Sequence, residues 1–300
     1  MTGDLVQIVV YGLTVGSVLA LVALGYNLVF ATSRVVNFAQ GSMLVVGGFV
    51  AFAFVRAGVP IWGALPLATI VGGLVGIAVD TLAIRPLRDF DAGSSVGWIL
   101  TTFSASLVCL EVVKLTIGAE PRSIPSLADS VFGWRGSTVS GVPIVPSDIL
   151  IVVSALTLMV VGEFVQKRTM AGRALRAVSQ DRTAASLMGI NPRRLVMFSF
   201  ALAGAVGALG AVLLAPRLFV KFDNGLLLGI QAFVAAVVGG LGSTKGAVLG
   251  GFVLGFVGGA LRVLSSTGGQ IEPLVVFVVF MLVLAVRPTG LLGLPVVEKA

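Results

Sequence analysis

The sequence predicts an all-α integral membrane protein, a polytopic bundle of eight to nine transmembrane helices. Composition is the first reason: 57% of the 300 residues are hydrophobic and 11% are charged, whereas soluble domains carry about a quarter charged residues. A chain this apolar lacks the polar surface that a soluble fold needs. The second reason is a series of long apolar runs, each ending at a charge, a proline or a glycine cluster.

Four apolar segments come before the first long polar connection. They are long enough to cross the hydrocarbon core, which takes about 20 residues. The first one is too long for a signal-peptide core and has no preceding Lys or Arg, so we expect it to remain as a helix. The four expected spans are Leu5–Phe30, Val35–Val55, Ile61–Ile84 and Val96–Ile117.

A polar connection at residues 118–146 follows, and its prolines exclude one continuous helix. We expect it to be an external loop. The fifth span is expected at Asp148–Gln166, with Ser147 or Asp148 in a position to cap its first amide groups.

Basic residues concentrate in one later connection. Of the 20 Lys and Arg residues, seven lie in residues 167–194, which favours a cytoplasmic position because such loops retain positive charge. The segment contains helix-forming residues, small residues at Ala184 and Ala185, and the breakers Gly189 and Pro192. A short amphipathic helix outside the bilayer is predicted, and it suits docking into a groove of a soluble partner or lying on anionic lipid.

The remaining apolar segments complete the bundle. The segment Leu226–Val238 has only about 13 residues, a length that suits either a re-entrant helix or a short span. If it is re-entrant, Arg287 lies on the outside. Glycines recur every four residues at 242, 246 and 250 and at 251, 255 and 259, a pattern that lets helices approach closely. The four segments are Leu195–Ala215, Leu226–Val238, Ala247–Leu264 and Ile271–Val286.

Residue types that carry chemistry are scarce. Histidine is absent and Cys109 is the single cysteine, so neither an internal disulfide, a zinc site nor a histidine-based nucleophilic triad is expected. The sequence lacks the phosphate-binding loop of ATPases. We therefore expect no metal, no cofactor and no catalysis in this chain. Nucleic-acid binding is not expected either, because the basic residues lie mainly between apolar spans. Glu111 and Lys114 are spaced to form a structural pair.

Several uncharged polar residues fall in or next to the expected spans. Such groups need partners in a membrane, which are either neighbouring helices or a passing solute. Hydrogen bonding between helices is the commoner role, so a substrate path is the second interpretation. The candidates are Asn37, Gln40, Thr101, Thr102 and Gln231.

Five motifs are spread along nearly the whole chain, at Gly12–Gly25, Val36–Gly41, Gly172–Pro192, Ala232–Ser243 and Arg287–Gly293. In these motifs and their order the sequence resembles the permeases of high-affinity branched-chain amino acid ABC transporters. One segment departs from the family, because Gln40 stands where its members usually have histidine.

The resemblance implies one permease domain over residues 1–300 in a bacterial-type cytoplasmic (inner) membrane. Asp181, Ala184, Ala185 and Gly189 resemble the coupling loop that contacts the ATPase subunit. The implied partners are two ATPase subunits, a second related permease and an external solute-binding protein. Branched-chain or similar hydrophobic amino acids are the implied solutes. Importers of urea or short amides remain an alternative, as does a carrier or channel that works alone, with its site near the broken segment at residues 225–240.

Overall fold

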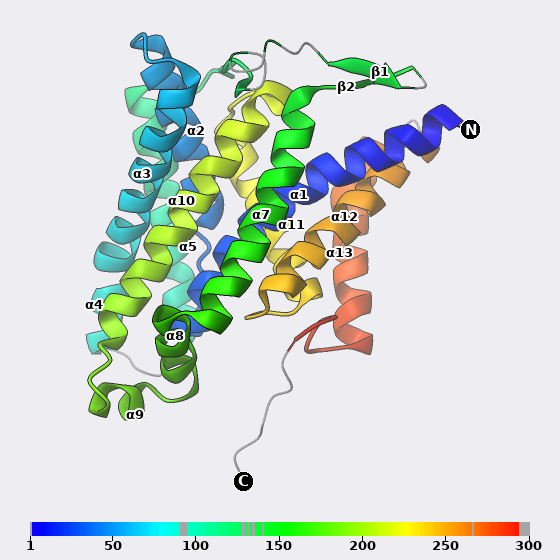
Figure 1. Ribbon diagram of the computed structural model, residues 1–300. Coiled ribbons are helices and arrows are strands. Elements are labelled where there is room, and N and C mark those ends of the chain that lie inside the picture. The colour runs from blue at the N-terminus through cyan, green and yellow to red at the C-terminus, as the bar shows by residue number, and fades with distance from the viewer. Residues whose placement is uncertain are drawn as a thin grey trace.

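The computed structural model of the chain describes residues 2–90, 95–127, 130, 133, 136–139, 141–265 and 267–293. Within these residues, seven helices are long and apolar enough to cross a membrane, which confirms the predicted helical membrane bundle (Figure 1). These are α1 (Thr2–Ser33), α3 (Ile61–Val79), α5 (Ser95–Thr116), α7 (Pro146–Arg168), α10 (Pro192–Leu218), α12 (Thr244–Leu264) and α13 (Gly268–Val286).

Two shorter apolar helices complete the set of expected segments. They are α2 (Gln40–Arg56) with 17 residues and α11 (Asn224–Gly239) with 16 residues. At a rise of about 1.5 Å per residue each is roughly 25 Å long, somewhat less than the hydrocarbon core. Both are largely buried among the longer helices, so neighbouring helices shield much of their surface from lipid.

α1 runs obliquely through the middle of the bundle (Figure 1). Buried residues make up 67% of its most apolar window, against 11% for α13. Its neighbours are α12, α10, α11 and α7. α1 is therefore the central element, whereas α13 lies at the edge.

Glycines explain how α1 and α12 approach so closely. A Cβ atom on Gly251 or Gly255 of α12 would overlap the backbone of α1 at Ala20 or Gly16. The predicted close packing is confirmed for these glycines, since their missing side chains let two backbones touch. Gly242 does not belong to the packed face: it lies in the turn before α12 with a φ of 85°.

The ends of the bundle differ in structure (Figure 1). At one end, the connection between α5 and α7 contains a small hairpin of β1 (Ser137–Val139) and β2 (Val142–Ile144), which is a departure from the all-α prediction. At the other end lie α8 (Met170–Gln180) and α9 (Arg182–Leu187). There α3 also continues through a π-helix, η1 (Asp80–Ile84), into α4 (Arg85–Phe90).

The predicted cap of α7 was wrong in one detail. The N-cap residue is Val145, and Asp148 sits inside the first turn. From there its carboxylate accepts a hydrogen bond from the backbone N–H of Val145 at 3.1 Å. Pro146 occupies the first helical position, where a missing N–H costs nothing, so the helix begins two residues earlier than the apolar run suggests.

Candidate coupling segment and solute path

The segment between α7 and α10 folds into two short helices that meet at Asp181. Asp181 ends α8, and its Oδ1 accepts the N–H groups of Thr183 at 2.8 Å and Ala184 at 3.0 Å to begin α9. These are the amides that a helix leaves without partners at its N-terminus. The sequence predicted one amphipathic helix here, and the aspartate divides it into two.

Gly189 ends α9 and turns the chain towards α10. Its φ is 81°, a region that side chains with a Cβ rarely adopt. Gly189 N–H donates to the carbonyl of Ser186, and Ile190 N–H donates to that of Ala185, which is the Schellman arrangement of a helix end. Ala185 is buried. Three of the four predicted coupling residues, Asp181, Ala184 and Gly189, thus form the ends of α9.

Two arginines attach this segment to the end of α1. Arg182 donates from Nη2 to the carbonyl oxygens of Thr32 at 2.9 Å and Ser33 at 2.6 Å. Arg34 donates in the opposite direction, to the carbonyl of Ser179 at 3.0 Å. A cation at a helix C-terminus is favourable because the last carbonyls carry partial negative charge. Burial, and next the nearby Arg34, lower the pKa of the Arg182 guanidinium from its ordinary value.

A second contact joins the segment to α7. Thr169 caps α8 by accepting the N–H of Gly172 at 3.1 Å. A Cβ atom on Gly172 would collide with the carbonyl oxygens of Val165 and Gln166. α8 therefore packs directly on the backbone of α7, and only glycine fits at the contact.

The tip of the segment carries two exposed apolar side chains. Leu187 is 84% exposed and Met188 is 82% exposed, next to the turn at Gly189. Exposed apolar side chains in an otherwise polar segment mark contact sites for another protein or a membrane. The sequence analysis did not single out this pair, although two large apolar residues directly before a glycine were a usable signal.

Gln40, one of the five predicted path residues, forms a side-chain hydrogen bond to another helix. It is fully buried in α2, and its Nε2 donates to the carbonyl of Ala203 in α10 at 2.9 Å. A Cβ atom on Gly25 of α1 would collide with its amide, so this glycine makes room for it. Its Oε1 accepts no hydrogen bond from the described part of the chain. Gln40 thus joins α1, α2 and α10.

The other four predicted path residues have local partners or lie apart. Asn37 precedes α2 and accepts the N–H of Ala39 at 3.1 Å. The hydroxyl groups of Thr101 and Thr102 donate to carbonyls one turn earlier in α5. Gln231 is buried in α11. α2 packs against both α5 and α11, so the five residues surround α2 without forming one cluster of side chains.

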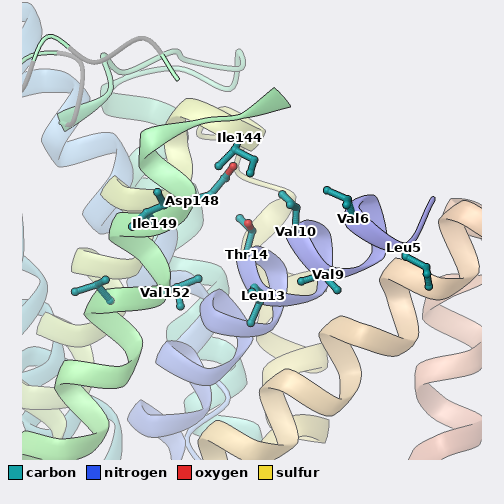
Figure 2. Close-up of a pocket in the computed structure, with 11 residues that line it drawn as sticks. Leu5, Val6, Val9, Val10, Leu13, Thr14, Ile144, Asp148, Ile149 and Val152 are labelled. Atoms are coloured by element: carbon teal, nitrogen blue, oxygen red, sulfur yellow. The ribbon is translucent and has the colours of Figure 1, made fainter. Parts of the chain in front are cut away.

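An apolar groove lies between the first half of α1 and the start of α7, with a volume of about 510 Å³ (Figure 2). Thr14 and Asp148 are the polar residues in its lining. Asp148 is already paired with Arg217 at the end of α10, whose Nε lies 2.7 Å from Oδ1. The groove therefore offers apolar contact, and none of the five predicted path residues lines it.

Two further side chains link distant elements, as Gln40 does. Asn27 of α1 accepts the N–H of Gly242 at 3.1 Å and donates to the carbonyl of Ser243 at 2.8 Å, holding the turn before α12. Arg182 holds α9 to α1 in a comparable way. Both partners are backbone atoms more than 140 positions away, so no local pattern in the sequence predicts them.

Comparisons with known proteins agree on the kind of molecule. A family model described as a branched-chain amino acid transport system permease component matches residues 8–286. The chain is 35% identical to BraD of Pseudomonas aeruginosa, a high-affinity branched-chain amino acid transport system permease protein, over 98% of this chain and 97% of the relative. LivH of Escherichia coli K12, which has the same description, is 32% identical over 96% of this chain and 95% of the relative.

A solved structure shares the fold. It shows a metal-chelate type ABC transporter in an inward-facing conformation, with a TM-score of 0.51, 17% identity, and coverage of 93% of this chain and 86% of that one. At this identity the likeness concerns the fold alone, whereas the family model and the two relatives match almost the full length. The chain thus belongs to the permease component family of branched-chain amino acid transport systems.

Proposed function

We propose that this chain is the membrane-spanning permease subunit of an ATP-driven importer for branched-chain or similar hydrophobic amino acids. All 300 residues would form one permease domain in a bacterial-type cytoplasmic (inner) membrane. Family membership and the apolar helices support this proposal. ATP hydrolysis belongs to partner subunits in this assignment, and the chain supplies the path and the mechanical link.

The proposed topology has nine crossings, with an external N-terminus. Seven crossings are the long helices, and α2 and α11 are the other two. Contacts at the two ends of α11 support a helix that crosses. Val220, just before α11, is bridged to Arg122 in the connection between α5 and α7. Lys245, just after α11, pairs with Glu163 near the end of α7 at 3.1 Å. Residues 167–194 then face the cytoplasm, and residues 118–146 face outward, towards a solute-binding protein.

The exposed pair Leu187 and Met188 is the observation that carries the coupling role. A short helix with a bare apolar tip fits an apolar groove on a soluble partner, and in this proposal the partner is an ATPase subunit. The tip is held to the membrane region by Arg182, which binds the end of α1. Movement of the docked helix would therefore reach the central helix of the bundle.

Alternating access would follow from this linkage. Two packed states of the two permeases, biased by ATP binding, would open the path to one side at a time. Asn37, Gln40, Thr101, Thr102 and Gln231 remain the proposed polar lining. Gln40 is the strongest of them, because its buried Oε1 still has an acceptor site that the described residues leave unused.

Reconstitution tests the proposal. The full complex of both permeases, the ATPase subunits and the binding protein is placed in liposomes, and uptake of labelled leucine is competed with isoleucine, valine and urea. We expect ATP-dependent uptake that isoleucine and valine suppress and urea does not. Suppression of uptake by urea, but not by isoleucine or valine, would show that the solute is not a branched-chain amino acid. Uptake by the purified single chain without ATP would overturn the importer assignment.

Variants of the coupling segment separate folding from coupling. Gly189→Pro removes the N–H and the positive φ that end α9, and Asp181→Arg removes its cap. We expect both to assemble but to lose solute-stimulated ATPase activity. Leu187→Ser with Met188→Ser should have the same effect. Met170→Ser, at the start of α8 and 74% exposed, is the matched control and should couple normally. Unchanged coupling in the Leu187 and Met188 double variant would refute the docking site.

A further inference from the structure

A basic cavity lies at the same end of the molecule as the coupling segment. It has a volume of about 280 Å³ and opens between η1 with α4 on one side and the start of α10 on the other. Figure 1 shows α4 and the start of α10 side by side near α9, and α10 packs on η1. Its lining includes Asp80, Thr81, Arg85, Asn191, Arg193 and Arg194.

The charge of the lining favours an anion. Three arginines face one carboxylate, Asp80, which is 4% exposed. Even if Asp80 neutralises one guanidinium, two positive charges remain. The N-terminus of α10 adds to them: Asn191 caps it by accepting the N–H of Arg194 at 3.2 Å, and the partial positive charge of a helix start favours negative groups. Planar guanidinium groups bind phosphate oxygens in pairs.

The surroundings indicate that the anion is part of an amphipathic molecule. Arg194, Phe198 and Leu202 follow one another at four-residue intervals, so they lie on one face of α10. Phe198 is 51% exposed and Leu202 is 37% exposed. Leu82 of η1, the element that forms the other wall, is 78% exposed. A strip of apolar surface thus leads from the arginines into the membrane region, where a free phosphate ion would gain nothing from it.

We propose that this cavity binds the phosphate group of an anionic phospholipid, with one acyl chain lying along Phe198 and Leu202 of α10. Arg85 and the pair Arg193 and Arg194 approach the phosphodiester from opposite walls. Basic pockets between helices near a membrane surface are suited to such headgroups. The proposal depends neither on the transported solute nor on the ATPase partner, so it stands or falls separately from the importer assignment.

The cavity also has a place in the mechanics of the chain. One wall is the π-helix η1, where the regular hydrogen-bond ladder of α3 is interrupted. The other wall begins three residues after Gly189, at the end of the coupling segment. A bound phospholipid would therefore join the end of the α3 helix to the start of α10, directly beside the region that docks the partner.

Native mass spectrometry of the full chain in detergent tests the site. The chain is titrated with phosphatidylglycerol and, separately, with phosphatidylethanolamine, and the bound lipid is counted. We expect one preferentially retained phosphatidylglycerol. Arg193→Gln with Arg194→Gln should weaken it roughly 30-fold, and Arg85→Gln roughly fivefold, because each surface arginine contributes about 1 kcal/mol to binding anionic lipid. All three side chains are exposed or at the rim, so the variants should keep the thermal transition of the parent.

A charge-matched control decides between a site and diffuse attraction. Arg173→Gln with Arg176→Gln removes two exposed arginines from α8, outside the cavity, and should change retention less than twofold. Phe198→Ser with Leu202→Ser should weaken phosphatidylglycerol binding, and glycerol phosphate should fail to displace the lipid. Three results would each overturn the proposal. They are a loss of lipid in the α8 variant equal to that in the Arg193 and Arg194 variant, unchanged lipid retention in the Arg193 and Arg194 variant, and displacement of the lipid by inorganic phosphate at the same concentration as the lipid.

Discussion

Arginines fasten helices at both ends of this molecule, but to different acceptors. At the end with the β hairpin, Arg217 binds the carboxylate of Asp148, which is 4% exposed, and Arg262 binds that of Glu272, which is 5% exposed. At the coupling end, Arg182 binds backbone carbonyls of α1. These arginines thus bind buried carboxylates at one end and neutral acceptors at the other.

This difference predicts different consequences of breaking the contacts. Loss of an arginine at the hairpin end leaves a buried carboxylate without its counter-ion, which is strongly destabilising. Loss of Arg182 leaves the neutral carbonyl groups of Thr32 and Ser33 without this donor, which costs less than a buried charge without its counter-ion. The arginine contacts at the hairpin end should thus be the costlier ones to break.

The largest expected effect is at Arg217. Arg217→Gln should lower the free energy of unfolding by about 3 kcal/mol or more, because the buried Asp148 then lacks its counter-ion. Thermal unfolding in detergent measures the loss. The double variant Arg217→Gln with Asp148→Asn removes both charges and should recover more than half of the lost stability. A double variant no more stable than the single one would show that the charge pair is not the cause.

Arg262→Gln should lower the free energy of unfolding by a smaller amount, about 2 kcal/mol. Its side chain is 46% exposed, and Glu272 keeps a second contact with the hydroxyl of Tyr11 at 3.4 Å. The same unfolding assay on Arg262→Gln, with Arg56→Gln as a control at an exposed position, measures this. A loss as large as that of Arg217→Gln would contradict the ranking.

Arg182→Gln should cost only about 1 kcal/mol in stability while abolishing solute-stimulated ATPase activity in the reconstituted complex. Arg182→Lys should restore part of the coupling, since the ammonium group can still donate to the carbonyls of Thr32 and Ser33. A variant that couples normally would show that the bond to α1 does not transmit movement. Basal ATPase activity of the complex serves as the control for assembly.

The smallest effect should come from the exposed pair Glu111 and Lys114. The pair forms as the sequence predicted, with Nζ and Oε1 3.4 Å apart and both side chains about half exposed. Exposed pairs contribute about 0–1 kcal/mol. Lys114→Gln should therefore leave the unfolding temperature nearly unchanged, and a loss comparable to that of Arg262→Gln would erase the distinction between buried and exposed pairs.

Sequence-based prediction succeeded where the physical cause is local. The nine apolar segments fold as helices because membrane-length apolar runs must satisfy their own backbone hydrogen bonds, and Gly189 ends a helix because its φ is positive. It was less complete where a side chain divides or extends an element. Asp181 splits the expected helix in two, and α7 begins early, at Pro146. Near each of these helix starts, several residues could have served as the cap, so the sequence did not single out one of them.

By itself, then, the sequence determined membrane residence, the helical character of the apolar segments, the basic segment at residues 167–194 and, through its motifs, the family. Only the tertiary structure decided which polar groups hold the bundle together: Asn27 on the turn before α12, Arg182 on the end of α1, Arg217 on Asp148. The reason is distance along the chain. Helix formation depends on neighbours within a few residues, whereas these bonds join atoms 69 to 216 positions apart, and only the packed arrangement of the helices brings them together.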